Sequence, residues 1–207
     1  MADLFEEKAK DWDVNEMVLN LSNAIGNAIL KNVNLEDNMH VMDFGAGTGL
    51  ITGHVLPKVK SILAVDISQS MLDQLLAKSN YEGKVKALCQ DITRQPLDEK
   101  FDVIVSAMAM HHVEDTDNLF ASLAAHLKPG GKLALADLDT EDGTFHPADI
   151  EGVFHHGFDR DQLKGLLEKQ GFNNIHFETA HTVDKEGKSY PVFLLTAEKG
   201  EQEKPLD

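Results

Sequence analysis

The stretch "HVMDFGAGTGL", His40 to Leu50, decides the fold of this chain. An apolar run leads into glycines at alternate positions, Gly45, Gly47 and Gly49. Ordering glycine costs more conformational entropy than ordering any other residue, so this turn must require a backbone without side chains. A dinucleotide-binding loop would need its third glycine at Leu50, and no lysine follows Gly49 as a phosphate-binding P-loop requires. The spacing therefore predicts a small ligand lying against a tight strand-to-helix turn.

Strands and helices alternate along most of the chain on either side of this stretch. Apolar runs predict the strands, and apolar residues at helical spacing predict the helices between them. Such alternation is typical of an α/β fold whose mostly parallel sheet is covered by helices on both faces. The polar turn "DKEGK" between the last two strands makes one of them antiparallel. Strands are predicted at 39–44, 61–66, 85–91, 101–109, 132–138, 174–180 and 190–198, and helices at 13–30, 49–56, 116–127 and 160–170. A further helix is predicted after the second strand, with the apolar stripe Met71, Leu72, Leu75 and Leu76.

Local signals predict where several helices begin and end. Asp13 with Glu16 has the spacing of a capping box for the first long helix. Ser68 and Asp159 are predicted N-caps of later helices. The sequence "KPGG", 128–131, is predicted to end the helix before it, since proline and glycine commonly follow a helix.

Polar residues follow each of the first five predicted strands. Because parallel strands place their carboxyl ends at one edge of a sheet, these residues should share one crevice. Asp66 ends the second strand, where a carboxylate can accept from both hydroxyls of a ribose, although a capping role is the alternative. Asp91 after the third strand suits an adenine amino group, with Ile92 against the ring, or else a solvated turn. "SAMAMHH", 106–112, and Asp137 follow the fourth and fifth strands.

Composition argues against several classes of partner. The chain has 35 acidic and 19 basic residues and a formal charge of −16, which repels phosphate backbones. We therefore expect no nucleic-acid substrate, although the charge can equally serve solubility alone. The single cysteine, Cys89, and the charged start "MADLFEEKAK" favour the cytoplasm, and no apolar run predicts contact with a membrane.

Five segments in order resemble the class I S-adenosylmethionine-dependent methyltransferases, in the small-molecule branch around the ubiquinone-biosynthesis-like (methyltransferase type 11) enzymes. The segments are "VMDFGAGTG", "LAVDIS" followed by "ML", "QDIT", "FDVIVSAMAMHHVED" and "LKPGGKLALAD". The resemblance covers about residues 10 to 198. It implies a Rossmann-like, doubly wound sheet of seven strands in the order 3-2-1-4-5-7-6, with strand seven antiparallel. We expect a helical cap at 1–35, the methyltransferase domain at 36–198 and a frayed tail at 199–207.

The resemblance also implies S-adenosylmethionine as cofactor and S-adenosylhomocysteine as product. Gly45 and Gly47 would face the methionine part of the cofactor. Ser106 and Ala107 would lie near the amino-acid end and the sulfonium. Asp43 matches the motif acid that orders the glycine loop or reaches the cofactor's amino group.

The nucleoside end of the cofactor is implied in the same way. Asp66 would bind the ribose, Ile67 or Met71 would flank the adenine, and Asp91 with Ile92 would hold its edge. The remaining residues expected to contact or enclose the cofactor are Trp12, Ala46, Thr48, Gly49 and Met108.

Two histidine pairs are candidates for taking a proton from the methyl acceptor. An oxygen or nitrogen nucleophile that loses a proton needs a base near neutral pKa, and histidine has an unperturbed pKa of about 6.5. His111 and His112 follow the fourth strand, where loop structure or cofactor contact is the alternative. His155 and His156 lie in the irregular segment 139–158, where they would touch the substrate or pack a lid. The histidine spacing does not favour a metal site, and none is predicted.

The predicted function is transfer of a methyl group to a small-molecule acceptor by in-line displacement. The signature of amino-directed nucleic-acid methyltransferases is replaced by "SAMA", and no Pro-Cys nucleophile is present. The alternatives are a non-catalytic S-adenosylmethionine-binding or partner-binding protein with the same fold, and a nicotinamide-dependent oxidoreductase, against which Leu50 argues. The chain is expected to be a monomer or homodimer.

Overall fold

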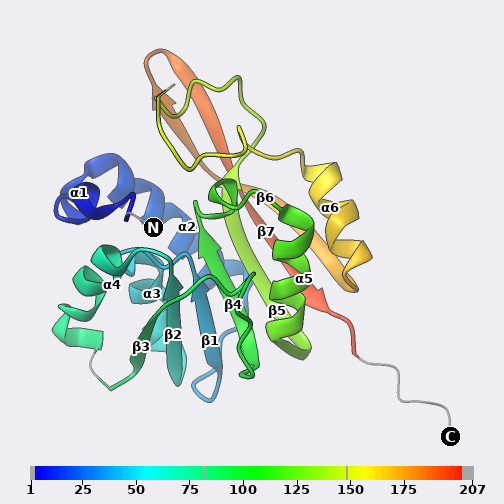
Figure 1. Cartoon of the computed structure of the whole chain (residues 1–207). Coiled ribbons are helices and arrows are strands. Elements are labelled where there is room, and N and C mark those ends of the chain that lie inside the picture. Colours follow the sequence, from blue (N-terminus) through cyan, green and yellow to red (C-terminus); the bar gives the residue numbers. More distant parts are fainter. Residues whose placement is uncertain (1–2, 82, 148, 202–207) are drawn as a thin grey trace, which may run out of the picture.

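Seven strands form one sheet in the order β3-β2-β1-β4-β5-β7-β6, which confirms the predicted topology (Figure 1). The computed structural model describes residues 3–81, 83–147 and 149–201. Strands β1 to β5 pair in parallel, and β7 runs antiparallel to both β5 and β6. The strands are β1 His40–Phe44, β2 Ser61–Asp66, β3 Val85–Cys89, β4 Phe101–Ala107, β5 Leu127–Leu138, β6 Phe172–Lys185 and β7 Lys188–Lys199.

Helices cover both faces of the sheet because side chains alternate between the two faces along each strand. On β1, Val41 packs with α2 and α3, whereas Met42 packs into the core that contains α5 and α6. No helix in the described ranges is long and apolar enough to cross a membrane. The helices are α1 Glu6–Ala9, η1 Trp12–Val14, α2 Glu16–Asn32, α3 Leu50–Val55, η2 Leu56–Lys58, α4 Gln69–Leu76, η3 Ser79–Tyr81, η4 Met110–His112, α5 Thr116–His126 and α6 Arg160–Lys169.

Strand β5 begins earlier than predicted, because "KPGG" forms a bulge inside the strand. Phe101 pairs with Leu127 and Val103 pairs with Lys132, so the residues 128–131 loop out between two adjacent pairs. The helix does end before this stretch, as predicted, but the chain joins the sheet at once.

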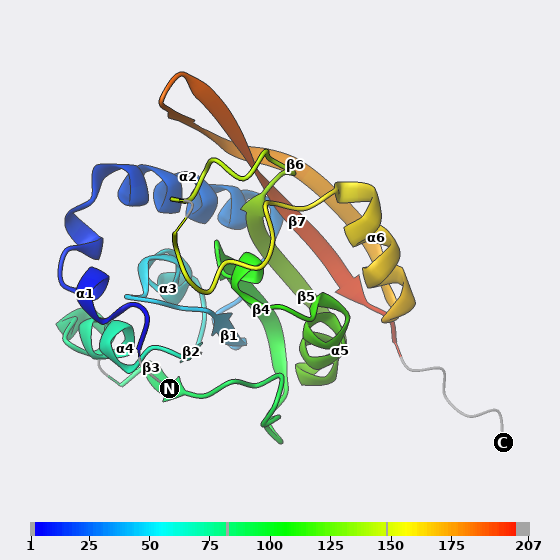
Figure 2. The ribbon, with the colours of Figure 1, turned by 45° about the horizontal axis from the view of Figure 1, so that its top comes forward.

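The β6–β7 hairpin is longer than predicted and projects beyond the edge of the sheet (Figure 2). Its strands continue to a two-residue turn at Glu186 and Gly187, where φ is +53° and +79°. Two positive φ angles are what a tight hairpin turn between right-twisted strands requires. The extra length carries the hairpin toward the segment between β5 and α6.

The N-terminal end of α2 differs from the prediction. Asn15, not Asp13, is the N-cap, and its side chain accepts from the amides of Met17 (3.0 Å) and Val18 (3.3 Å). Asp13 lies two residues before Asn15, in η1, and its side chain accepts a hydrogen bond from Thr48 instead.

The predicted N-caps Ser68 and Asp159 are confirmed. Ser68 accepts from the amide of Met71 at 3.2 Å, and Asp159 accepts from the amide of Gln162 at 2.9 Å. The division into cap, domain and tail stays a prediction, and most of the expected tail, 202–207, lies outside the described residues.

Substitutions at the start of α2 distinguish the observed N-cap, Asn15, from the predicted capping box of Asp13 and Glu16. Asn15→Ala should lower the free energy of unfolding by about 1 kcal/mol, because two helix amides lose their acceptor. Glu16→Ala, the matched control in the expected capping box, should cost at most about 0.5 kcal/mol. Urea unfolding measures both, and a larger loss for Glu16→Ala would contradict the observed cap.

Candidate functional site

The glycine loop turns tightly across the carboxyl ends of β1 and β2. The amides of Gly45 and Ala46 both donate to the carbonyl of Val65, at 2.8 and 3.1 Å. At Gly45, φ is +66°, and a Cβ would lie 2.3 Å from the Cβ of Ala109. At Gly47, φ is +54°, yet a Cβ would meet nothing within 4 Å. The loop is therefore closed on the β4 side and open beside Gly47.

Asp66 is held at the end of β2 by two backbone amides. Its Oδ2 accepts from Gly47 N and its Oδ1 from Ser68 N, both at 2.8 Å. Burial raises the pKa of Asp66, and these hydrogen bonds partly offset the effect. A carboxylate has about four lone-pair sites, so each oxygen keeps a site for a further donor.

Asp43, the last residue but one of β1, is almost fully buried, with 1% of its surface exposed. Its Oδ2 accepts from the hydroxyl of Thr52 at 2.6 Å. Burial, with a further contribution from the charge of Asp66, raises the pKa of Asp43 to about 7. This carboxyl group therefore changes its charge near neutral pH.

The other residues expected at the nucleoside end are divided between surface and core. Ile67 is 63% exposed, an unusual position for a large apolar side chain. Met71 and Ile92 are buried, so their side chains belong to the core. Asp91 is half-buried, and its Oδ1 accepts from both the amide and the hydroxyl of Thr93.

At the end of β4, Ser106 does not present its hydroxyl to the crevice. Ser106 is fully buried and donates to the carbonyl of Phe44 at 2.6 Å. Ala107 and Met108 are half-buried, and Met108 has a φ of +55°, which is uncommon for a residue with a side chain. The strand thus ends in a sharp change of direction just before the histidines.

The segment before α2 is tied to the glycine loop. Thr48 donates from its hydroxyl to Asp13 at 2.5 Å. Lys78 of the region after α4 donates to the carbonyl of Thr48 and forms an ion pair with Asp13, both at 2.7 Å. Trp12 is half-buried and contacts Phe5 edge-on, with ring centroids 6.4 Å apart. These contacts place η1 against the loop.

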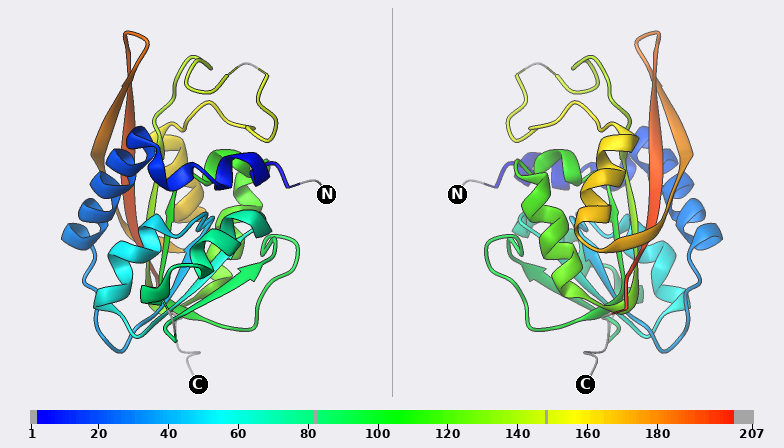
Figure 3. Two further views of the ribbon diagram at one scale, coloured as in Figure 1. Left: turned by 90° about the vertical axis from the view of Figure 1, so that its left-hand side faces the viewer. Right: turned by 90° about the vertical axis from the view of Figure 1, so that its right-hand side faces the viewer.

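A second tie lies nearer the N-terminus. Asp3 accepts from the hydroxyl of Ser68 at 2.9 Å and from the amide of Ser70 at 3.0 Å. The first turn of α4 is therefore capped twice, by Ser68 and by a carboxylate from the start of the chain. The α1 helix is thereby held across the carboxyl edge of the sheet (Figure 3).

His111 and Asp137 form a buried pair between η4 and β5. Their side chains are 1% and 0% exposed, and His111 Nδ1 lies 2.8 Å from Asp137 Oδ1. The backbone amide of His111 donates to the other carboxylate oxygen at 3.2 Å. Because the carboxylate accepts the Nδ1 proton, Nε2 carries the lone pair in the neutral ring. In the described part of the chain, this buried Nε2 has no hydrogen-bond partner.

Two further imidazoles lie against His111, and one of them was not predicted. The ring centroids of His112 and His146 are 4.1 and 4.9 Å from that of His111. Burial, and secondly the neighbouring His111, lowers the pKa of both to about 4. His146 lies in a segment without strand or helix periodicity. Apart from its residue type, nothing in the sequence marks it as part of the site. No group of His, Cys, Asp or Glu side chains suited to a metal ion occurs among the described residues.

The other predicted pair, His155 and His156, has different partners. His155 Nε2 lies 2.9 Å from the carbonyl of Val113, and its ring packs against Phe158. The side chain of His156 is 61% exposed and lies 3.5 Å from Glu141. These contacts hold the segment in place, and the structure groups His146, not this pair, with His111.

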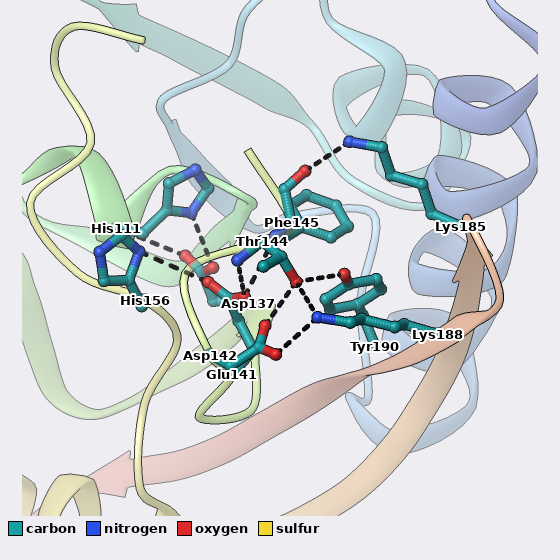
Figure 4. A network of polar contacts seen from close by, with 10 residues as sticks. All are labelled: His111, Asp137, Glu141, Asp142, Thr144, Phe145, His156, Lys185, Lys188 and Tyr190. Carbon is teal, nitrogen blue, oxygen red and sulfur yellow. Dashed lines mark hydrogen bonds and ion pairs between the residues drawn. The ribbon is translucent and has the colours of Figure 1, made fainter. Parts of the chain in front are cut away.

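The β6–β7 hairpin contacts Thr144 and Phe145, which directly precede His146 in the sequence (Figure 4). Lys185 donates to the carbonyl of Phe145 at 2.8 Å, and the hydroxyls of Tyr190 and Thr144 are 2.7 Å apart. The rings of Phe145 and Tyr190 also meet edge-on, with centroids 5.2 Å apart. The position of His146 therefore depends on a hairpin at the other edge of the sheet from β1, β2 and β3.

A cavity of about 300 Å³ lies between α1 and the segment that follows His146. His112 is part of its lining, and the rings of Phe5 and His112 meet edge-on with centroids 5.4 Å apart. The full lining is Leu4, Phe5, Lys8, His112, Pro147, Asp149, Ile150 and Glu151.

Comparison with known proteins shows what this chain is similar to. Residues 42–135 match the family model described as a methyltransferase domain. An uncharacterized methyltransferase of Schizosaccharomyces pombe is 35% identical over 166 residues, which cover 70% of this chain and 58% of that protein. A ubiquinone biosynthesis O-methyltransferase of Coxiella burnetii is 30% identical over 142 residues, covering 65% of this chain and 60% of the relative. The chain thus spans about three-fifths of the length of these relatives.

The fold is also similar to that of solved structures. The structure of the DhpI–SAH complex superposes with a TM-score of 0.74, covering 96% of this chain and 95% of that chain, at 18% identity. At this identity the likeness establishes the fold alone.

The buried Asp43 makes stability depend on pH. The folded protein keeps the Asp43 proton up to pH about 7, whereas the unfolded chain loses it near pH 4, so stability falls as pH rises through this range. Asp43→Asn removes that loss while its amide oxygen still accepts from Thr52. The free energy of unfolding of the variant relative to wild type should rise by about 2 kcal/mol between pH 5 and pH 8. Urea titrations test this, with the exposed Asp73→Asn as control, and a flat difference would contradict it.

The histidine cluster should have the opposite pH dependence. With folded pKa values of about 4 for His112 and His146, the unfolded chain binds more protons between pH about 6.5 and 4, so stability falls as pH decreases. In His146→Asn, the thermal midpoint should fall less between pH 6.5 and pH 4 than it does in the wild type. His156→Asn, which replaces an exposed ring, should leave the pH dependence of the midpoint unchanged. Equal acid sensitivity of wild type and His146→Asn would contradict the assignment.

Proposed function

We propose that this chain is a class I S-adenosylmethionine-dependent methyltransferase that methylates a small-molecule acceptor with S-adenosylmethionine as cofactor; the match to the methyltransferase domain over residues 42–135 supports this. When bound, this cofactor supplies a methyl group on a sulfonium, already activated for in-line displacement. The protein then has to position the cofactor and the methyl acceptor, and to take up the proton that the acceptor loses. The observation that carries the proposal is the Asp66 carboxylate, held by the amide of Gly47 beside open space.

The residues at the carboxyl edge fit the cofactor. The free lone-pair sites of Asp66 suit two ribose hydroxyls, and its negative charge disfavours a 2′-phosphate. The exposed face of Ile67 suits an adenine ring, and the open side of Gly47 admits a narrow chain such as the methionine arm. Asp43 serves this end of the site by fixing the loop through Thr52.

The remaining contacts predicted for the cofactor are part of the same proposal. Side-chain contact fits half-buried Trp12 and Asp91 better than Met71, Ile92 and Ser106, which lie in the core. The side chains of these core residues would contribute indirectly, by fixing the backbone that lines the cofactor site. The other loop and strand-end residues expected at the cofactor are Ala46, Thr48, Gly49, Ala107 and Met108.

His111 is the residue proposed to accept the proton that the acceptor loses. Its Nδ1–H binds Asp137, which fixes the ring and stabilises the imidazolium formed when Nε2 takes up a proton. The absence of any other partner for this buried Nε2 in the described residues supports the proposal, since an unsatisfied buried polar atom is costly. An acceptor hydroxyl or amine would satisfy it.

Titration calorimetry with S-adenosylhomocysteine tests the cofactor site. Asp66→Ala should weaken binding by about 10- to 100-fold, because hydrogen bonds to a charged group are worth about 1.5–3 kcal/mol each. Asp73→Ala removes an exposed carboxylate from the neighbouring helix α4 and should change the affinity less than about twofold.

Two outcomes would contradict the proposal. One is the absence of S-adenosylhomocysteine binding to the folded wild-type chain, and the other is equal binding to Asp66→Ala. Binding without methyl transfer to any member of a panel of hydroxylated and amine-bearing metabolites would instead favour a non-catalytic cofactor-binding protein.

A further inference from the structure

The loop between β3 and β4, residues 90–100, carries part of the proposed cofactor site on irregular backbone. All of its residues are described by the structure, and none of them lies in a helix or strand. The loop starts beside the proposed ribose site, because the amide of Gln90 donates to the carbonyl of Asp66 at 2.9 Å. Asp91 and Ile92 follow directly. Backbone polar groups outside regular elements still need partners, so this loop depends on contacts with other elements.

Helix α5 presents a row of polar side chains to this loop. We call this row the α5 stripe, and its members are Asn118, Ser122 and His126. They are four residues apart, which places them along one face of the helix. The hydroxyl of Ser122 donates to the carbonyl of Ile92 at 3.0 Å. The side-chain amide of Asn118 donates to the carbonyl of Thr93 at 3.3 Å. Two consecutive carbonyls of the loop are thus bound to α5.

His126 holds the loop farther along the chain. Its Nδ1 lies 2.7 Å from the carbonyl of Ser122, which can only accept, so Nδ1 carries the proton. Its Nε2 then has the lone pair and accepts from the amide of Leu97 at 2.8 Å. Burial lowers the pKa of His126, which favours this neutral ring. Both ring nitrogens are therefore used, one within α5 and one on the loop.

Contacts inside the loop carry this support to Asp91. Its Oδ1 accepts from the amide of Thr93 at 3.0 Å and from the hydroxyl of the same residue at 2.6 Å. The amide of Gln95 donates to the Asp91 carbonyl at 2.9 Å. Oδ2 pairs with the exposed side chain of Arg94 at 3.3 Å and keeps a lone pair for a further donor. The direction of this carboxylate thus depends on a residue that is itself bound to α5.

The side chain of Ile92 adds an apolar attachment to the same helix. It is 1% exposed and belongs to the core that contains Leu119 and Leu123 of α5. Its carbonyl and its side chain are thus both held by one element. Burial of this residue, which was expected at the adenine ring, therefore fits a role in anchoring the loop.

We propose that the α5 stripe positions Asp91 for the amino group of adenine, so that helix α5 determines how strongly the base of the cofactor is recognised. The inference rests on the proposed function, because it takes Asp91 to lie at the adenine edge. The members of the stripe are positioning residues, since they act through the loop. A loop that is already held in place loses less conformational freedom when the ligand binds, which raises the affinity.

The experiment measures binding of two ligands to the full chain by titration calorimetry. One is S-adenosylhomocysteine, and the other is its deamino analogue, in which hydrogen replaces the amino group of adenine. Wild type should bind S-adenosylhomocysteine at least about tenfold more tightly, because the amino group donates to a carboxylate. His126→Phe keeps a ring without the acceptor for Leu97, and should lower this preference to less than about threefold. His126→Gln keeps an acceptor and should restore the preference to within about twofold of wild type.

The controls separate positioning from general support of the fold. Ser122→Ala removes the hydroxyl bound to Ile92 and should also lower the preference, and it gives the comparison if His126→Phe does not fold. Asp117→Ala is the matched control, because Asp117 of α5 pairs with Lys169 of α6 at 2.6 Å and not with the loop. It should leave the preference unchanged. Affinity for the deamino analogue reports folding and should change less than about twofold in every variant.

Several outcomes would overturn the inference. A preference that survives both His126→Phe and Ser122→Ala removes the role of the stripe. Equal weakening of both ligands shows general support of the fold instead of positioning, and a His126→Gln variant that behaves like His126→Phe excludes the bond to Leu97 as the cause. If wild type binds both ligands equally, Asp91 does not contact the amino group, and the inference fails while the proposed function stands. If S-adenosylhomocysteine itself does not bind, the proposed function fails.

Discussion

The hydrogen bond from the Gly47 amide to Asp66 is the contact on which the candidate cofactor site depends. It joins the ends of two adjacent parallel strands at 2.8 Å, and it forms because the loop has no side chain that would hold the backbone away from the carboxylate. The amides of Gly45 and Ala46 fix the same loop on Val65. The two amides that bind Asp66 lower its pKa against the larger effect of burial and fix the direction of the carboxylate, which suits recognition of a neutral diol.

A different constraint acts beside β5, where the half-buried imidazoles of His112 and His146 pack against the buried pair of His111 and Asp137. Asp137 accepts from the ring and the amide of His111 and from the amide of Leu138. That arrangement fixes one tautomer and leaves nitrogen atoms without partners in the described residues. Such unsatisfied groups are uncommon in folded proteins and often occur where a ligand completes the hydrogen bonding.

Much of the scaffold could be predicted from the sequence, because parallel strands and their helices have regular periods and short caps. Ser68 and Asp159 were identifiable as caps, and Asp66 as the residue that ends β2. Asn15 was missed because two good capping residues lie two positions apart, and only packing decides between them. The side chains of Met71, Ile92 and Ser106 are buried in the core, and their expected role at the cofactor stays a prediction. His146 had no periodic neighbourhood, so only the tertiary contacts of the hairpin could reveal it.

The long β6–β7 hairpin has a consequence for which mutations this protein can accept. The bonds from Lys185 to Phe145 and from Tyr190 to Thr144 hold the segment that carries His146, whereas the glycine loop and Asp66 form the proposed cofactor side. Because substitutions at separate supports have nearly additive effects, mutations in the hairpin should change the surroundings of His146 and leave the glycine loop and Asp66 undisturbed. Under the proposed function, the choice of methyl acceptor could then diverge through the hairpin and this segment while the cofactor site stays the same.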